Sequence, residues 1–286
     1  MSMRPGSTVG ASVVSVEGSK LTTKADRLAT EEPMELREGV RSGGDWKLQS
    51  VAVTMRTPGN DFELAAGFAF TEGIITGRED VDSIAYCTDP GEPQNYNIVN
   101  VYLSGTPKFD IDKLSRHVYT SSSCGVCGKG SIELVRTACP NKPVGDFRLT
   151  ARVLSTLPST LAEGQALFSK TGGIHATALF KPDGELLLVR EDVGRHNAMD
   201  KVIGALIMQG RIPASDTLAF VSGRSSFELV QKASMAGIPA LVSVGAPSSL
   251  AVDLAIELGM TLLGFFRGSR FNVYSGSQRV EIPPTP

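Results

Sequence analysis

Apolar and polar positions follow different periods in the two halves of the chain. In the first half, to about residue 142, the runs SVAVTMR (50–56) and NIVNVYL (97–103) alternate apolar and polar residues. This alternation is typical of strands with one buried face. A helix is expected from Asn60, because Asn60 can cap it and Glu63 follows three residues later. The first half is therefore predicted to be β-rich with some helix.

The second half alternates strands and helices more regularly. Helical segments at about 150–168 precede two strands joined by a Pro-Asp-Gly turn, and three helix–strand units follow. Ser225 and Glu228 are spaced like a capping box for the second of these helices. The order predicts a mixed, mainly parallel sheet with helices on both faces and an antiparallel hairpin at its start. The expected strands are GIHATALF (173–180), ELLLVRE (185–191), TLAFVSG (217–223), ALVSVGA (240–246) and TLLGFFR (261–267).

This order of elements resembles the three-layer α-β-α cytidine deaminase-like fold. Deaminases of that fold hold zinc with H-x-E and P-C-x-x-C motifs. Here His196-Asn197-Ala198 lacks the glutamate, and Ser222-Gly223-Arg224-Ser225 lacks the cysteines, so deaminase chemistry is not expected. The predicted division is a β-rich α+β domain over 1–142, a nucleotide-binding domain over 143–276 and a loose tail over 277–286.

Amino-acid composition and net charge limit the classes of protein to which the chain can belong. Of 286 residues, 41% are hydrophobic and 20% charged, and the formal net charge is −2. These values are ordinary for a soluble domain and do not favour non-specific nucleic-acid binding. No apolar run is long enough for a membrane span, and the first residues lack a secretory signal pattern. The expected compartment is the cytoplasm, where thiols stay reduced.

Polar, glycine-containing motifs follow four of the predicted strands. They are EDVGRHN (191–197), SGRSS (222–226), GAPSS (245–249) and RGSR (267–270). Ligands of open α/β sheets bind at the carboxyl ends of strands, and glycine and arginine suit anionic groups. We therefore expect a large anionic ligand at this edge. Each motif alone is equally consistent with ordinary turn chemistry.

Two further groups of residues have alternative interpretations. In TGGIHA (171–176), Gly172 and Gly173 suit a tight turn and His175 suits a core position, although a ligand contact is also open. Asp192 could orient an arginine or contact the ligand. His117 has no supporting motif and is assigned to structure.

The segment SSSCGVCGKGSIE (121–133) contains a CxxC pair, Cys124 and Cys127. Structural zinc usually needs two such pairs, so zinc is not favoured. A dithiol redox role remains open. The serines, the glycines and Lys129 also suit a loop at 121–130 that carries a reactive thiolate.

Several long motifs resemble the FdhD/NarQ family of formate dehydrogenase accessory sulfurtransferases. The resemblance runs from about residue 30 to 275. It is carried by TPGNDFELAAGFAFTEGII (57–75), CGVCGKGSIE (124–133), TGGIHATAL (171–179), REDVGRHNAMDKVIG (190–204), SGRSSFELVQKA (222–233) and TLLGFFRGSRFNVY (261–274). One departure is Ala69, where the family has a larger apolar residue.

The resemblance implies a function and a site. Members take sulfur from a cysteine desulfurase as a persulfide, here on Cys124 with Cys127 assisting. They pass it to the bis-molybdopterin guanine dinucleotide cofactor, a molybdenum cofactor that then enters the formate dehydrogenase apoenzyme. GDP would mimic part of this cargo. The family's cofactor-binding stretch matches Phe265, Phe266, Arg267, Gly268, Ser269 and Arg270. Further candidate cofactor-binding residues are Gly172, Gly173, His175, Asp192, Arg195, His196, Asn197, Ser222, Gly223 and Arg224.

Two other functions stay open from the sequence. A chaperone that delivers the cofactor without sulfur transfer would need the loops but not the cysteines. A dithiol oxidoreductase would need the cysteines but no nucleotide. A homodimer is expected because symmetric dimers are the commonest oligomers.

Overall fold

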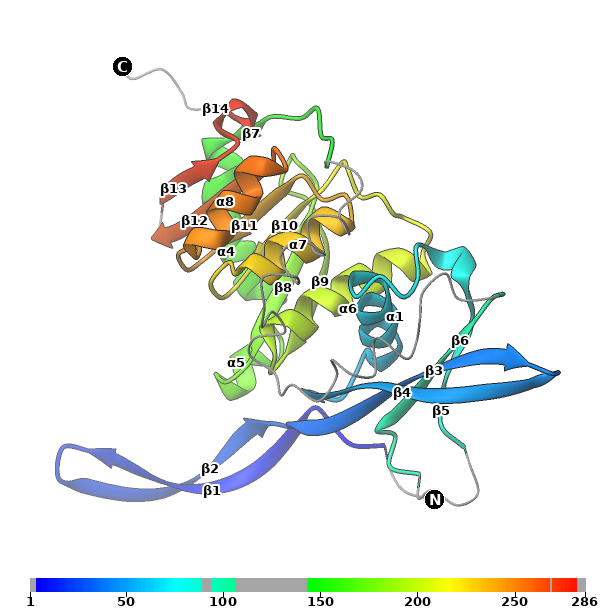
Figure 1. Cartoon of the computed structure of the whole chain (residues 1–286). Coiled ribbons are helices and arrows are strands. Elements are labelled where there is room, and N and C mark those ends of the chain that lie inside the picture. The colour runs from blue at the N-terminus through cyan, green and yellow to red at the C-terminus, as the bar shows by residue number, and fades with distance from the viewer. Residues whose placement is uncertain (1–3, 89–93, 106–142, 268, 282–286) are drawn as a thin grey trace.

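A six-stranded sheet forms the centre of the second half of the protein. The structure is a computed structural model that describes residues 4–88, 94–105, 143–267 and 269–281 (Figure 1). The order of strands across the sheet is β13-β12-β11-β10-β8-β9. The strands are β8 (His175–Phe180), β9 (Leu186–Asp192), β10 (Leu218–Val221), β11 (Ala240–Ser243), β12 (Thr261–Arg267) and β13 (Arg270–Ser275).

The pairing of these strands is mixed, as predicted, but it is not mainly parallel. β10 pairs in parallel with β11, and β11 with β12. The pairs β8–β9, β8–β10 and β12–β13 are antiparallel. Antiparallel pairs therefore outnumber parallel ones among the described strands. The main reason is β13, which is not among the strands expected from the sequence and which pairs antiparallel with β12.

Helices cover both faces of this sheet. Leu154, Leu157 and Leu161 of α4 pack on one face with Phe180 and Phe220. α6, α7 and α8 pack on the other face. The result is the predicted three-layer arrangement, while the specific likeness to deaminases stays a prediction. The helices are α4 (Ala151–Gly164), α5 (Phe168–Thr171), α6 (Arg195–Met208), α7 (Phe227–Met235) and α8 (Ser249–Glu257). None of the helices in the described ranges is long and apolar enough to cross a membrane.

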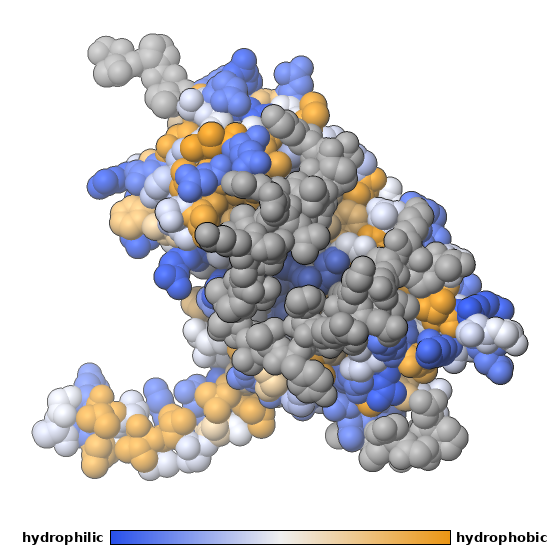
Figure 2. Space-filling model, in the orientation of Figure 1, coloured by the Kyte–Doolittle hydropathy of each residue, from blue (hydrophilic) through white to orange (hydrophobic). Residues whose placement is uncertain are grey.

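The first half is β-rich, as predicted. Its four-stranded sheet has the order β4-β3-β6-β5, and one helix, α1, packs on it. A separate hairpin of β1 and β2 extends from the body (Figure 1), and Figure 2 shows apolar surface along it. The exposed side chains of Val14, Val16 and Leu21 lie near its turn. The elements are β1 (Thr8–Glu17), β2 (Lys20–Ala29), β3 (Glu32–Ser42), β4 (Asp45–Arg56), α1 (Asp61–Thr71), η1 (Arg78–Asp80), β5 (Val81–Tyr86) and β6 (Ile98–Leu103).

One hydrophobic core spans both halves, because α1 crosses α6 at very short range. A Cβ atom built on Gly67 would lie 1.8 Å from the carbonyl oxygen of Asp200, and one on Gly204 would lie 1.7 Å from that of Glu63. The two glycines therefore let the helix backbones touch. The same buried cluster contains Leu64 of α1 and Ile203 of α6. The segments on either side of the predicted domain boundary at residue 142 therefore share one continuous hydrophobic core.

The C-terminal segment also joins the body. Residues 277–281, which the sequence predicts to be part of a loose tail, instead form η2 (Ser277–Arg279) and β14 (Val280–Glu281). β14 pairs in parallel with β7 (Leu149–Thr150). Arg279 fastens the turn by donating to the carbonyl oxygens of Gly145 and Gly259.

Candidate functional site

The predicted polar loops meet along one edge of the six-stranded sheet. The amide of Ala176 donates to the hydroxyl of Ser222 over 2.9 Å. The amide of Gly245 donates to the carbonyl oxygen of Gly223 over 2.9 Å, and that of Phe265 donates to Gly245 over 3.0 Å. Four strand ends are thus joined side by side by direct hydrogen bonds. These bonds confirm the shared edge for the SGRSS and GAPSS loops and the end of β12, and the EDVGRHN turn joins it because Asp192 of β9 pairs with His175 of β8.

An open pocket of about 200 Å³ lies beside this edge. Its lining consists of Glu31, Met55, His175 and residues 193–196. Residues 193–196 form the turn into α6, so Arg195 and His196 occupy its first helical turn. The start of a helix favours anions, and these two side chains can add positive charge. The pocket therefore combines features that suit an anionic ligand.

His196 has partners on the neighbouring helix α7. Its Nε2 atom lies 2.7 Å from a carboxylate oxygen of Glu228 and 3.2 Å from the hydroxyl of Ser226. The predicted capping box of Ser225 and Glu228 is therefore wrong. Ser226 is the N-cap residue, its side chain makes no capping bond, and the hydroxyl of Ser225 is buried without a hydrogen-bond partner. The acidic residue that suggested a cap holds His196 instead.

His175 lies at the start of β8, close to Gly223. A Cβ atom on Gly223 would lie 3.5 Å from Nδ1 of His175, so the ring packs against the SGRSS loop. Partial burial lowers the pKa of His175, and the charges of Arg195 and His196 lower this pKa further. The neutral imidazole is therefore favoured at pH 7, and in that form it can both donate and accept a hydrogen bond.

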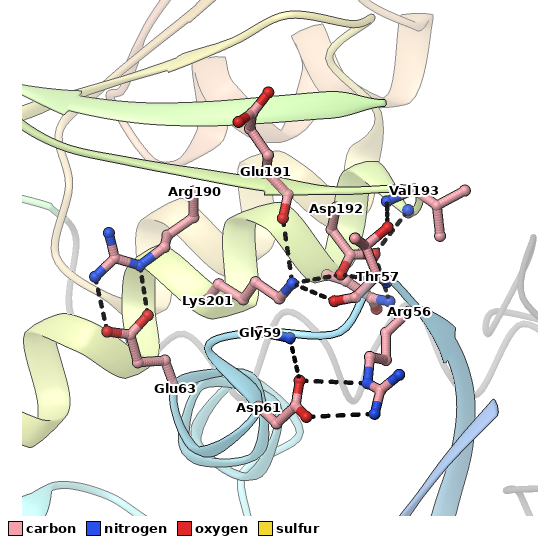
Figure 3. A network of polar contacts seen from close by, with 12 residues as sticks. Arg56, Thr57, Gly59, Asp61, Glu63, Arg190, Glu191, Asp192, Val193 and Lys201 are labelled. Carbon is pink, nitrogen blue, oxygen red and sulfur yellow. Dashed lines mark hydrogen bonds and ion pairs between the residues drawn. The ribbon is translucent and has the colours of Figure 1, made fainter. Parts of the chain in front are cut away.

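Asp192 is fully buried, and its carboxylate is already occupied (Figure 3). One oxygen lies 2.7 Å from Nζ of Lys201 and accepts from the amide of Thr57. The other accepts from the amide of Gly194 and the side-chain amide of Asn197. Asp192 therefore shapes the turn of the pocket from within, and this geometry favours a positioning role over direct contact with a ligand.

Asn197 is similarly occupied by protein groups. Its amide nitrogen donates to the carbonyl oxygen of Met55 over 2.8 Å, and its oxygen accepts from Thr54 over 3.2 Å. The side chain therefore links α6 to β4 of the first half. Direct binding of a ligand by Asn197 stays a prediction, and its contacts support a positioning role.

The first-half motif TPGND, residues 57–61, contacts the turn that leads into α6, because Thr57 is hydrogen-bonded to Asp192 and Val193. Lys201, 1% exposed, also donates to the carbonyl oxygen of Thr57 over 3.0 Å. Arg56 lies fully buried between Asp61 and Glu32, and Figure 3 shows it directly beneath Thr57. In the sequence, this motif stands out only through the family resemblance. No local pattern could place it at the pocket, since its partners lie more than 130 residues away.

Phe265, the first residue of the FFRGSR motif, forms a strained corner at the far end of the same edge. Phe265 has a φ of 60°, which is unfavourable for a bulky residue, and its side chain is 37% exposed. The guanidinium of Arg267 lies 4.9 Å from the centre of its ring. Phe266 is buried, whereas Ser269 and Arg270 are exposed. Gly268 lies outside the described residues.

The remaining candidates divide into turn residues and surface residues. Gly172 ends α5 with a φ of 64°, so its conformation is explained by the turn. Gly173 follows it and is exposed. Arg224 is exposed on the SGRSS loop. Cys124 and Cys127 lie outside the described residues, as does His117.

Comparison with known proteins agrees with this picture. The model of the FdhD/NarQ family matches residues 39–281. The sulfur carrier protein FdhD of Streptomyces coelicolor is 48% identical over 276 residues, covering 94% of each chain. That of Mycobacterium tuberculosis is 46% identical over 272 residues, covering 93% of this chain and 95% of the relative.

A solved structure shows the same fold. It is the crystal structure of a candidate formate dehydrogenase accessory protein from Desulfotalea psychrophila, with a TM-score of 0.72 and 24% identity. The match covers 96% of this chain and 99% of that one. With the extensive match to the family model and to relatives well above 30% identity, the chain belongs to the FdhD/NarQ family.

Proposed function

We propose that this protein is a sulfurtransferase that carries sulfur as a persulfide on Cys124. The donor is a cysteine desulfurase, and the acceptor is the bis-molybdopterin guanine dinucleotide cofactor destined for formate dehydrogenase. The observation that carries the proposal is the edge of the sheet, where several predicted loops meet beside a pocket lined by His175, Arg195 and His196. Relatives named sulfur carrier proteins support the sulfur chemistry.

The edge suits the chemical character of this cargo. The cofactor carries guanine bases and pyrophosphates, so a binding site must offer both flat apolar surface and positive charge. Arg195 and His196 supply charge at one end, and exposed Phe265 with the stacked Arg267 supplies an aromatic surface at the other. Stacking on such a ring is worth about 1–3 kcal/mol per base. The strained backbone of Phe265 is consistent with a functional role.

The proposed reaction balances with the two cysteines. The Cys124 thiolate attacks the terminal sulfur of the desulfurase persulfide, which releases the desulfurase thiolate and leaves a Cys124 persulfide. Once the cofactor is bound as acceptor, attack of the Cys127 thiolate on Sγ of Cys124 forms a disulfide, and the terminal sulfur leaves as sulfide for the cofactor. The two thiols supply the two electrons. A thiol reductant restores the dithiol.

Intact mass spectrometry tests the first step. The protein is incubated with a cysteine desulfurase and L-cysteine, with Cys124→Ala and Cys127→Ala in parallel. We expect a gain of one sulfur atom that a reductant removes, that is absent in Cys124→Ala and that persists in Cys127→Ala. Because the Cys124→Ala variant keeps every described contact of the edge, it should still bind GDP.

The same experiment distinguishes the alternatives. No gain of sulfur in the wild type together with binding of GDP would favour a delivery chaperone. A disulfide that cycles without sulfur uptake or nucleotide binding would favour a dithiol oxidoreductase. The proposal further includes a cytoplasmic location, a homodimer, the absence of zinc and no binding of nucleic acid. Sedimentation tests the dimer, and metal analysis of the purified protein tests the zinc.

A further inference from the structure

Glu31 differs from the other carboxylates around the pocket because no protein group in the described ranges occupies it. Glu32 pairs with Arg56, and Glu228 pairs with His196. Asp192 is surrounded by four donors. Glu31 lies exposed between β2 and β3, lines the pocket, and has no hydrogen bond or ion pair among the described residues. Its two oxygens are therefore available to a ligand.

The surroundings of Glu31 suggest which kind of group it meets. A carboxylate repels phosphate, so the phosphates of a nucleotide belong at the other side chains of the pocket, Arg195, His196 and His175. Met55, which is 39% exposed, lines the pocket as well. A thioether packs favourably against aromatic rings. Glu31 thus suits the hydrogen-bonding edge of a nucleobase, and Met55 suits its flat face.

Among the common nucleobases, guanine matches a carboxylate best. Its N1–H and 2-amino groups are adjacent donors, and a carboxylate can accept from both. Adenine presents an acceptor at the corresponding ring nitrogen, which would face the lone pairs of the carboxylate. A base without these donors forfeits two charge-assisted hydrogen bonds, so one carboxylate can discriminate between bases.

We propose that Glu31 is the residue that selects guanine, accepting from N1–H and the 2-amino group of a base that packs on Met55. The diphosphate then extends over Gly194 toward Arg195 and His196. This inference rests on the proposed function, because it assumes that the pocket receives one of the guanine nucleotides of the cargo. It assigns the pocket to a whole nucleotide and leaves the corner at Phe265 for the second base.

The test measures binding of GDP, IDP, XDP and ADP by calorimetry to the full-length protein and to Glu31→Gln. Inosine lacks the 2-amino group, and xanthine has a carbonyl oxygen in its place. The wild type should bind GDP about tenfold or more tightly than the other three, since one such hydrogen bond is worth about 1.5–3 kcal/mol. Glu31→Gln should bind GDP about tenfold more weakly and XDP about tenfold more tightly, because its amide can donate to the xanthine oxygen.

Glu17→Gln is the matched control, since it removes the same charge from the exposed end of β1. It should leave all four affinities unchanged. If the wild type binds GDP but Glu31→Gln keeps the ratio of GDP to XDP affinity, the role of Glu31 is refuted and the proposed function stands. A uniform rise in affinity for all nucleotides would show simple charge repulsion and would also refute it. If the wild type binds none of the four, the nucleotide part of the proposed function fails as well.

Discussion

Glu38 provides a direct test of how the first-half sheet is stabilised. This residue of β3 is 1% exposed, and neither of its carboxylate oxygens has a hydrogen-bond partner among the residues that the structure describes. Burial raises the pKa of Glu38 from its ordinary value of 4.5 to about 8. The folded protein therefore holds this proton more tightly than the unfolded chain does. The stability that protonated Glu38 contributes is fully present below pH 4.5 and is lost as the pH rises through about 8.

The size of the effect follows from the two pKa values. At 1.36 kcal/mol per pKa unit, the wild type loses about 5 kcal/mol of unfolding free energy in all because of Glu38, and about 4 kcal/mol of this loss falls between pH 4.5 and pH 8. Glu38→Gln keeps the shape of the side chain but cannot ionise. Its gain in stability over the wild type should therefore grow by about 3 kcal/mol between pH 5.5 and pH 8.5. Glu38→Leu should exceed Glu38→Gln in stability by about 1–3 kcal/mol at every pH, because no unpartnered polar atom remains at this position.

Urea unfolding at a series of pH values measures this difference. The single tryptophan, Trp46 in β4, lies on the strand next to Glu38 and reports the unfolding of this sheet. Glu35→Gln on the same strand is the control. Hydrogen bonds from Arg37 hold the pKa of Glu35 below its ordinary value, so this variant should lose stability above pH 4.5 and gain none. A stability difference for Glu38→Gln that does not vary with pH would refute the reasoning.

Further predictions concern the helix crossing, the buried turn and the strained corner. Gly204→Ala should destabilise the protein by about 3 kcal/mol or more in urea unfolding, because its Cβ would meet backbone 1.7 Å away, whereas Gly10→Ala, with open space around it, should have little effect. Asp192→Asn should cost about 3–5 kcal/mol because it leaves the buried Lys201 charge unpaired; full stability of this variant would argue against the buried ion pair. Phe265→Gly should stabilise the fold by about 1 kcal/mol by relieving the positive φ, yet weaken the binding of a second GDP in calorimetry while leaving the first unchanged; unchanged binding of both would remove Phe265 from the site.

Much of the architecture is readable from local sequence. The strands and helices of the second half follow from periodicity, because a buried strand or helix face repeats every two or about 3.6 residues. The loops at the sheet edge follow from the rule that carboxyl ends of parallel strands coincide, and the bonds from Gly245 to Gly223 and from Phe265 to Gly245 confirm it. The long motifs sufficed to indicate the family.

The contacts that hold the side chains of the site in place could be identified only from the tertiary structure. Asp192 meets Thr57 across 135 residues, and Glu228 meets His196 across two helices. Such contacts leave no periodic trace, so Glu228 resembled a helix cap, and the protein partners of Asp192 could not be identified from the sequence. For the same reason, the sequence did not indicate that β13 folds back onto β12 or that Gly67 contacts α6. Periodicity records which face of an element is buried, but the partner of that face is chosen by packing between distant segments.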